Sequence, residues 1–276
     1  MPRRTAIPLY KSRHVAFVRG AADYPNFDKG LSGVLHVGTG VRPDTIGHVH
    51  TNWFRWKPTR DGEPTLYLKV PASDPCRKYG THEPCGDCNM LGHGEFEPKT
   101  PAGEGREILI DDTWTNPVTK EREYFPLKDM VRRYFAHTGT HAPDDAMHGE
   151  KMIGGDGVSK GTLNKWYRDI GAYTEISAQF REDRLRQELE IKDPIDNSND
   201  RETVQIKNFG TDDKGNEIPD IISHDLRATF CTQLMRTDTN PDKAIKKTGH
   251  KTAQSMAPYI SFANGEIDKQ EETHMY

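Results

Sequence analysis

The sequence predicts an α+β protein that is mainly helical and contains a small antiparallel β-sheet. Apolar residues recur at helical spacing over 126–137, 160–176 and 225–235, and Pro241 begins a further helical stretch that ends near 248. Two short stretches, 64–71 and 106–110, instead alternate between apolar and polar residues as strands do. A Cys- and Gly-rich insertion separates these two strands along the chain.

Residues 31–49 predict two helices joined by a tight turn. Apolar residues keep helical spacing up to Val37, the Gly38-Thr39-Gly40 triplet interrupts the pattern, and the spacing resumes at Ile46. The polar, Gly-rich stretch 138–159 predicts a mobile loop.

Composition limits the possible functions. No continuous apolar stretch is long enough for a transmembrane helix or a secretory signal, so we expect no membrane partner. The 38 Lys and Arg residues against 42 Asp and Glu residues give a net charge of -4, which argues against coating nucleic acid through bulk charge. Any contact with nucleic acid must therefore come from local basic patches, and Lys243, Lys246, Lys247 and Lys251 form one.

Three of the four cysteines lie close together in the insertion. Cys76, Cys85, Cys88 and His93 follow the spacing Cys-x8-Cys-x2-Cys-x4-His, and His82 is a competing imidazole. This set suits a structural zinc site, but the spacing lacks two Cys-x-x-Cys knuckles and also fits reduced, unligated thiols. Such cysteine usage indicates a reducing compartment, and we expect a cytoplasmic protein.

The most informative residues lie near the C-terminal end. His224 and Arg227 are three positions apart, so they share one face of a helix and can reach one anionic group together. Gly249-His250 follows 23 residues after Arg227 at the end of a helix, and Tyr259 follows nine residues later. Taken singly, each residue has an ordinary structural explanation as a cap, an ion pair or a packing residue.

Taken together, these spaced elements resemble the C-terminal signature of the tyrosine recombinases, the phage integrase family. Val37-Gly-Thr-Gly-Val-Arg42 resembles the family's first Arg motif, and Pro98-Lys99-Thr100 before 105–110 resembles the hairpin that carries its Lys. The resemblance spans roughly residues 10–262, nearly the whole chain, and is greatest to the archaeal, particularly haloarchaeal, branch. It implies the family's catalytic domain fold, with a set of catalytic residues comprising Arg42, Lys99, His224, Arg227, His250 and Tyr259.

The resemblance also implies the reaction. Tyr259 would attack a DNA phosphodiester, form a 3′-phosphotyrosyl bond and release a 5′-hydroxyl, without ATP or a metal. Arg42 and Arg227 would hold the non-bridging oxygens, and Lys99 would protonate the leaving oxygen. The two histidines would accept the tyrosyl proton and donate to the phosphate, with His224 the possible acceptor, and their assignment stays open.

The implied function is site-specific recombination or integration of a virus or mobile element, with double-stranded DNA and a homotetramer on paired sites as partners. We expect the protein in the cytoplasm near the nucleoid, or in the host cytoplasm if viral. The alternatives are a type IB topoisomerase-like DNA relaxer and a catalytically silent DNA-binding relative; a third class is a zinc-dependent structural DNA-binding module.

The family also implies a division of the chain. Residues 1–22 form a basic N-terminal segment or linker, 23–262 the catalytic domain with the insertion at 72–95, and 263–276 a tail. Two departures stand out: Thr45 occupies the position of the usual acid, with Asp44 one place early, and Thr248 replaces the apolar residue before Gly-His. Because Arg42 comes so early, we expect either a catalytic domain alone or a chain that lacks a preceding core-binding domain.

Overall fold

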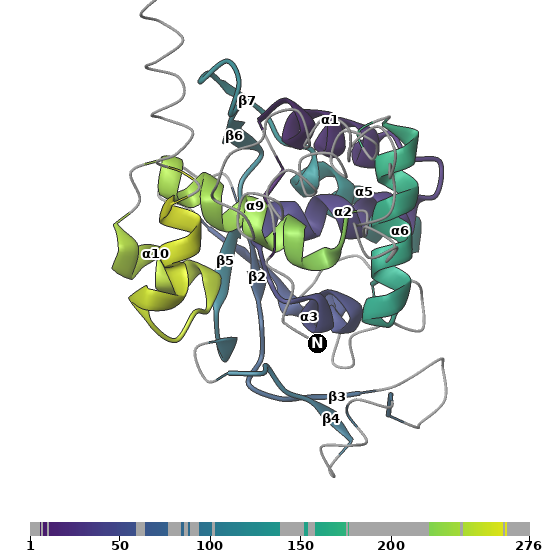
Figure 1. The fold of residues 1–276 in the computed structure, drawn as a ribbon. Coiled ribbons are helices and arrows are strands. Elements are labelled where there is room, and N and C mark those ends of the chain that lie inside the picture. Colours follow the sequence, from purple (N-terminus) through teal and green to yellow (C-terminus); the bar gives the residue numbers. More distant parts are fainter. Residues whose placement is uncertain are drawn as a thin grey trace, which may run out of the picture.

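The computed structural model shows a mainly helical α+β fold with three small antiparallel sheets (Figure 1). It describes residues 6, 8–9, 11–58, 64–76, 84–85, 88, 94–100, 103–138, 152–153, 158–174, 176, 221–237, 240–261 and 263. The helices are α1 (Lys11–Ala22), α2 (Phe27–Thr39), α3 (Pro43–His48), α5 (Leu127–Thr138), α6 (Lys160–Tyr173), α9 (Ser223–Arg236) and α10 (Pro241–Thr248), with 3-10 turns η1 (Thr51–Trp53) and η3 (Ala253–Met256).

Helix α2 lies at the centre of the fold and contacts α1, α5, α6 and α9. Leu31, Val34 and Leu35 are fully buried, as expected for apolar residues at i, i+3 and i+4 of one helix. Asn26 begins the helix by accepting a hydrogen bond from the backbone N–H of Lys29 at 3.0 Å. The helix predicted around 31–37 is thus confirmed, and it supplies the platform on which the other helices pack.

The main sheet has the order β1-β2-β5, with β1 (Phe54–Lys57), β2 (Thr65–Lys69) and β5 (Glu107–Ile110) all antiparallel. Leu66 and Leu68 of β2 are fully buried, whereas Tyr67 between them is half-buried. The strands predicted at 64–71 and 106–110 are confirmed as β2 and β5. Each buries every second side chain, which is the pattern of a sheet with one face against the core.

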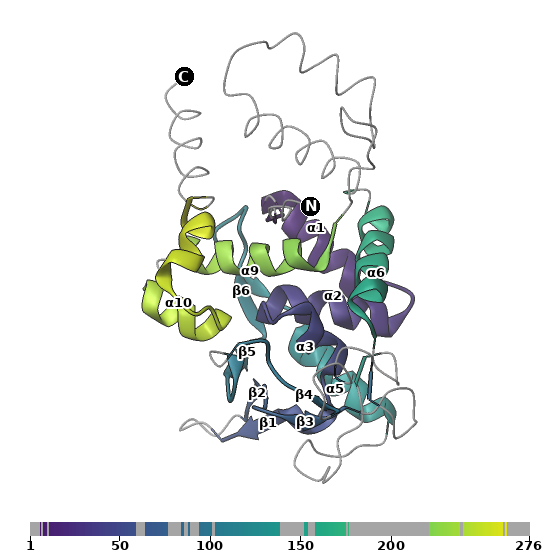
Figure 2. The same cartoon turned by 60° about the horizontal axis from the view of Figure 1, so that its bottom comes forward.

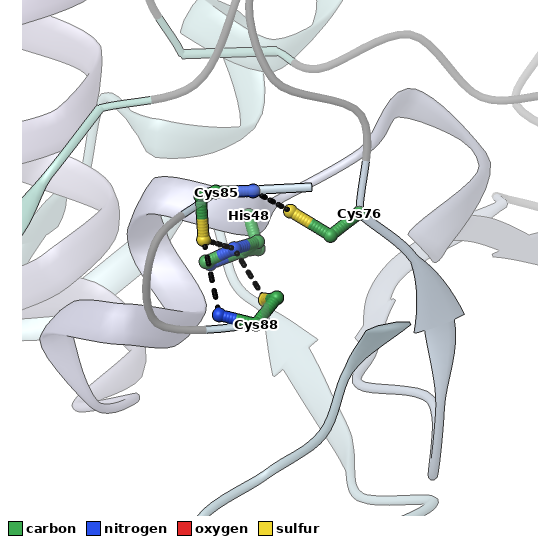
Figure 3. A group of neighbouring side chains, drawn as sticks. All are labelled: His48, Cys76, Cys85 and Cys88. Carbon is green, nitrogen blue, oxygen red and sulfur yellow. Dashed lines mark hydrogen bonds between the residues drawn. The ribbon is translucent and has the colours of Figure 1, made fainter. Parts of the chain in front are cut away.

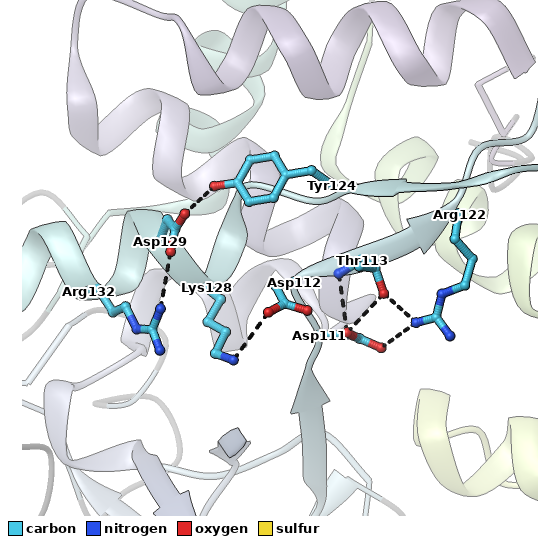
Figure 4. A network of polar contacts seen from close by, with 8 residues as sticks. All are labelled: Asp111, Asp112, Thr113, Arg122, Tyr124, Lys128, Asp129 and Arg132. Carbon is cyan, nitrogen blue, oxygen red and sulfur yellow. Dashed lines mark hydrogen bonds and ion pairs between the residues drawn. The ribbon is translucent and has the colours of Figure 1, made fainter. Parts of the chain in front are cut away.

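The described part of the chain also contains two short hairpins. β3 (Asp74–Pro75) pairs with β4 (Glu95–Phe96), and this hairpin lies next to the end of α3, where the ring of Phe96 stacks on His48 (Figure 2). β6 (Thr113–Thr115) pairs with β7 (Arg122–Tyr124) just before α5. Figure 4 shows the polar side chains around this second hairpin. Tyr124 of β7 donates to Asp129 of α5, and Lys128 of α5 donates to Asp112 just before β6, so these two pairs join the hairpin region to α5. The other pairs are local: Arg132 with Asp129 within α5, and Arg122 with Asp111 and Thr113 within the hairpin region.

Residues 11–22 differ from the expected linker. Residues 11–22 form α1, which packs on α2 and α6 with Phe17, Val18 and Ala21 buried. These apolar residues share one helical face, and their burial stabilises the packed helix. Packing does not require burying the charge of Arg19, whose side chain remains exposed.

The predicted loop 138–159 falls mostly outside the described residues, as do most of the insertion and the tail from 264 onward. Met152 and Ile153 are described, and both are buried in the core rather than exposed as a mobile loop requires. The backbone N–H of Met152 donates to the carbonyl oxygen of Val49 at 2.8 Å, which anchors this part of the chain beside α3. Within the described ranges, no helix combines the length and apolar character needed to cross a membrane.

Gly40 follows α2 as its C-cap and lies against Phe230 of α9. A substitution at this position therefore measures how tightly α9 packs on the end of α2. The φ of +57° at Gly40 is left-handed, and a Cβ would lie 2.1 Å from Cδ1 of Phe230. We expect Gly40→Ala to lower the free energy of unfolding by about 2–4 kcal/mol, combining backbone strain with overpacking. Gly105→Ala is the matched control, because its φ of +61° is equally strained but a Cβ would meet nothing within 4 Å. We expect it to cost about 1 kcal/mol in the same denaturation experiment; equal losses would contradict close packing at Phe230.

Candidate active site

Arg227 of α9 joins the parts of the site. Its side chain is buried, and its guanidinium donates hydrogen bonds to the carbonyl oxygen of Gly40 and to that of Thr248, the latter at 2.8 Å. It also lies 3.4 Å from Nε2 of His250. One side chain therefore connects the end of α2, the end of α10 and the predicted histidine.

The turn after α10 places His250. Gly249 adopts a left-handed φ of +66° and its N–H bonds to the carbonyl oxygen of Ile245 at 2.8 Å, so the helix stops and the chain turns back. Nδ1 of His250 lies 2.6 Å from Oγ1 of Thr248, which itself donates to the carbonyl oxygen of Ala244 at 2.8 Å. Thr248, the departure from the family pattern, thus holds the imidazole by a hydrogen bond.

Both predicted histidines are neutral at pH 7. Burial and, after it, the positive charges of Arg227, Arg42 and Arg106 lower the pKa of His250 to about 3. Burial and then the charge of Lys160 lower the pKa of His224 to about 4. Lys160 begins α6, and its Nζ lies 3.1 Å from Nε2 of His224, a contact the sequence analysis missed. Each imidazole can therefore accept a proton.

Tyr259 lies beside His250. Residues 257–261 are helical, and the rings of Tyr259 and His250 are 5.6 Å apart between centroids. Burial raises the pKa of the Tyr259 hydroxyl, while the charges of Arg227 and Arg42 oppose that rise. The predicted nucleophile is thus half-buried next to a neutral imidazole and near two cations.

Arg42 is the N-cap residue of α3 and lines a small pocket with Arg227. Burial and then the charge of Arg227 lower the pKa of Arg42, whereas the carboxylate of Asp44 raises it. The Asp44 carboxylate also acts to raise the pKa of His224. The acid that stands one place early in the sequence therefore still supports Arg42 electrostatically, while Thr45 is buried at the pocket wall.

A third arginine, Arg106, lines the same pocket and was missed by the sequence analysis. It lies just before β5 and is only 9% exposed, and its buried Nε has no hydrogen-bond partner among the described residues. Burial and the charge of Arg227 lower its pKa to about 9, so it stays protonated at neutral pH. An arginine before a strand carries no recognisable motif. We call Arg42, Arg106 and Arg227 the arginine cluster.

Lys99 is not brought into contact with the arginine cluster. Its side chain is exposed in the segment after β4, although its neighbours Pro98 and Thr100 line the pocket. The predicted basic patch is also on the surface: the side chains of Lys243, Lys246, Lys247 and Lys251 are exposed on α10 and just after it. The structure thus brings Arg42, Arg227, His250 and Tyr259 together, with His224 electrostatically coupled to them and Lys99 nearby along the chain.

A second group of side chains lies at the other end of α3. Nε2 of His48 is 3.4 Å from Sγ of Cys85 and 3.3 Å from Sγ of Cys88 (Figure 3). With Cys76 they place one nitrogen and three sulfur atoms within 4.8 Å of one another. A hydrogen bond between Cys76 and Cys88 lowers the pKa of the Cys76 thiol and raises that of Cys88. We call these four residues the His-Cys cluster; its donor atoms are those that zinc prefers.

Three of the expected metal ligands, Cys76, Cys85 and Cys88, lie together in the His-Cys cluster. His93 and the competing His82 lie outside the described residues, and the imidazole found with the thiols is His48. His48 is 37 positions from Cys85 along the chain, so no local spacing could have identified it.

Comparison with known proteins bears on the fold. No protein-family model and no curated protein matches the chain. Among solved structures, it is similar to the XerH site-specific recombinase bound to palindromic difH substrate in a post-cleavage complex, with 10% identity and a TM-score of 0.52. That match covers 98% of this chain and 54% of XerH, so the chain spans about half the length of that neighbour. A pre-cleavage complex of XerH with difH substrate matches at 11% identity and a TM-score of 0.50, covering 95% of this chain and 53% of the other.

The electrostatic coupling within the site can be measured without DNA. We expect Arg42→Gln and Arg106→Gln each to raise the pKa of His250, because removing a nearby positive charge makes protonation less costly. The rise should be larger for Arg42→Gln, since Arg42 has the stronger effect of the two. NMR titration of the His250 ring protons provides the measurement.

Arg122→Gln is the control for that titration, because Arg122 is an exposed arginine of β7. It should leave the pKa of His250 unchanged. An unchanged His250 titration in Arg106→Gln would show that Arg106 does not belong to the arginine cluster.

Proposed function

We propose that this chain carries the catalytic site of a tyrosine recombinase or integrase, a site-specific enzyme that cleaves and rejoins DNA. The observation that carries the proposal is the convergence of a buried arginine, Arg227, with His250 beside Tyr259 and with Arg42 across a small pocket. The similarity of fold to a site-specific recombinase supports it. A cationic pocket beside a tyrosine is suited to transfer a phosphoryl group to the phenolic oxygen.

The reaction is a transesterification. The phenolic oxygen of Tyr259 attacks the phosphorus of a DNA phosphodiester, and the bond from phosphorus to the 5′-oxygen breaks. A 3′-phosphotyrosyl ester and a free 5′-hydroxyl result, and the reverse attack by another 5′-hydroxyl rejoins the strand. Because one ester replaces another, neither ATP nor a cofactor is required.

The arginine cluster provides the charge that this reaction needs. A pentacovalent phosphorus carries more negative charge than the diester, and guanidinium forks donate to its non-bridging oxygens in fixed directions. Arg227 is already held by two backbone carbonyls, so it pays little for reorientation when DNA binds. The Nε of Arg106, which has no partner in the described part of the chain, offers a further donor at the same pocket.

The proton of Tyr259 needs an acceptor, and the geometry supports His250. His250 is neutral at pH 7 and its ring contacts Tyr259, whereas Nε2 of His224 faces Lys160. His224 and Lys160 then act on the phosphate side. Lys99 lies on the segment that flanks the pocket and protonates the leaving 5′-oxygen once bound DNA draws that segment inward.

Double-stranded DNA is the proposed partner, with four protomers on paired sites during strand exchange. The exposed lysines of α10 border the pocket residues Thr248 and Gly249, and they would contact backbone phosphates. The proposed source is an archaeal, particularly haloarchaeal, virus or mobile element, and the proposed location is the cytoplasm close to the nucleoid.

Covalent trapping tests the nucleophile. With a pool of nicked duplexes of randomised sequence, the wild-type chain should form a protein–DNA adduct that resists denaturation. The short piece between the cleaved bond and the nick carries the free 5′-hydroxyl, and its diffusion away from the duplex prevents rejoining. Tyr259→Phe should form none, since it lacks the attacking oxygen. A denaturing gel of the labelled DNA gives the readout.

Tyr173→Phe is the matched control in the trapping experiment, because Tyr173 is an exposed tyrosine of α6. It should trap DNA as the wild type does. An adduct that persists in Tyr259→Phe would overturn the assignment of the nucleophile, and DNA binding without any adduct would favour the silent relative. Relaxation of supercoiled DNA without transfer between two sites would favour the topoisomerase-like alternative.

Arg106 can be tested on the trapped sequence. We expect Arg106→Gln to slow adduct formation about 10²- to 10³-fold under single-turnover conditions, the usual effect of removing one donor to a developing oxyanion. Arg106→Lys should recover part of the rate because it keeps the charge. Arg122→Gln should cleave normally, and thermal melting confirms that each variant is folded. Cleavage by Arg106→Gln at the wild-type rate would remove Arg106 from the site.

A further inference from the structure

We propose that His48, Cys76, Cys85 and Cys88 bind one structural zinc ion, and that this ion fixes α3 and the β3–β4 hairpin relative to each other. The proposal does not depend on the proposed function, because it rests on a different group of side chains. It replaces the imidazole of the predicted ligand set, His93, with that of His48, the last residue of α3, whose N-cap is Arg42.

The spacing of the donor atoms suits tetrahedral zinc. Zn–S bonds of about 2.3 Å and Zn–N bonds of about 2.0 Å place tetrahedral ligand atoms about 3.5–3.8 Å apart. The two S···N separations of 3.3 and 3.4 Å at His48 are close to this value. The largest separation in the cluster is within 4.8 Å, so an ion needs only small side-chain rotations.

Hydrogen bonds prepare the ligands for a cation. Nδ1 of His48 donates to the carbonyl oxygen of Asp44 at 2.6 Å, which leaves the lone pair of Nε2 directed at the thiols. The backbone N–H of Cys85 donates to Sγ of Cys76 at 3.4 Å, and that of Cys88 to Sγ of Cys85 at 3.5 Å. Such bonds stabilise thiolates, the form in which cysteine binds a metal.

The site is enclosed, which distinguishes a structural ion from a catalytic one. Cys76, Cys88 and His48 are each less than 9% exposed, and the His48 ring stacks on Phe96 with centroids 4.9 Å apart. Four protein ligands complete a tetrahedron and leave no position for substrate. Three thiolates and one imidazole are a soft donor set that favours zinc over calcium or magnesium.

The ligands come from parts of the chain that hold the active site. His48 ends α3, whose N-cap is Arg42, so a helix of six residues links the ion directly to the first arginine. Cys76 directly follows β3, and β4 leads into the segment with Lys99. Asp74 of β3 also accepts from Nε1 of Trp53 and lies 3.1 Å from Nδ1 of His50, so η1 is drawn to the same hairpin.

Metal analysis of the purified full chain tests the site. We expect one zinc per chain by elemental mass spectrometry, and after exchange for cobalt the visible spectrum of a tetrahedral thiolate complex. His48→Gln and Cys88→Ser should each lose the zinc to a chelator that leaves the wild type loaded. His93→Gln is the matched control and should retain it.

Three outcomes would overturn the proposal. They are a folded, zinc-free wild type that binds neither zinc nor cobalt, a His48→Gln variant that retains zinc under the chelator, and loss of zinc in His93→Gln. If a ligand variant fails to fold, cobalt titration of the chelator-treated wild type still decides whether the metal binds. None of these measurements uses DNA, so they are independent of any failure to cleave.

Hydrogen exchange tests the structural consequence. Removing zinc from the wild type should speed amide exchange in α3 and in the β3–β4 hairpin, while α9, which supplies no ligand, should change little. Unchanged exchange in α3 after the metal is removed would show that the ion does not hold the helix.

Discussion

The site depends on one buried cation, the guanidinium of Arg227. Within the described residues its bonding partners are two backbone carbonyls and an imidazole, and none of them is a carboxylate. A buried charge without a counterion is costly, and the carbonyl dipoles of Gly40 and Thr248 offset only part of that cost. The ends of α2 and α10 must therefore stay where they are, and both use a left-handed glycine to do so.

The same cation explains the state of its neighbours. It lowers the pKa of His250 and of Arg106, and it opposes the effect of burial on Tyr259. An arriving phosphate would cancel much of this field, raise the pKa of His250 and so make that imidazole a better proton acceptor than in the free protein. Binding of the anion and readiness for proton transfer would then be linked through electrostatics alone.

The elements predicted correctly from the sequence are those with a local pattern of apolar residues. The helices around 31–37 and 225–235 and the strands β2 and β5 have clear apolar periods, and the spaced residues from His224 to Tyr259 include Arg227, His250 and Tyr259, which the structure brings close together. Sequence reasoning missed Arg106, Lys160 and His48 because their roles arise only from tertiary contacts between distant segments. It misjudged residues 11–22 because charge was weighed above the apolar face that contains Phe17 and Val18.

The insertion has a topology that limits its effect on the sheet. β2 and β5 are adjacent strands, and the backbone N–H of Val70 bonds to the carbonyl oxygen of Arg106 at 2.9 Å, so the chain leaves and re-enters the sheet at one point. Insertions or deletions between these residues therefore need not shift the strand register. Arg106 lies at that junction, so its position is fixed by the pairing of β2 with β5 and not by the length of the chain between the two strands.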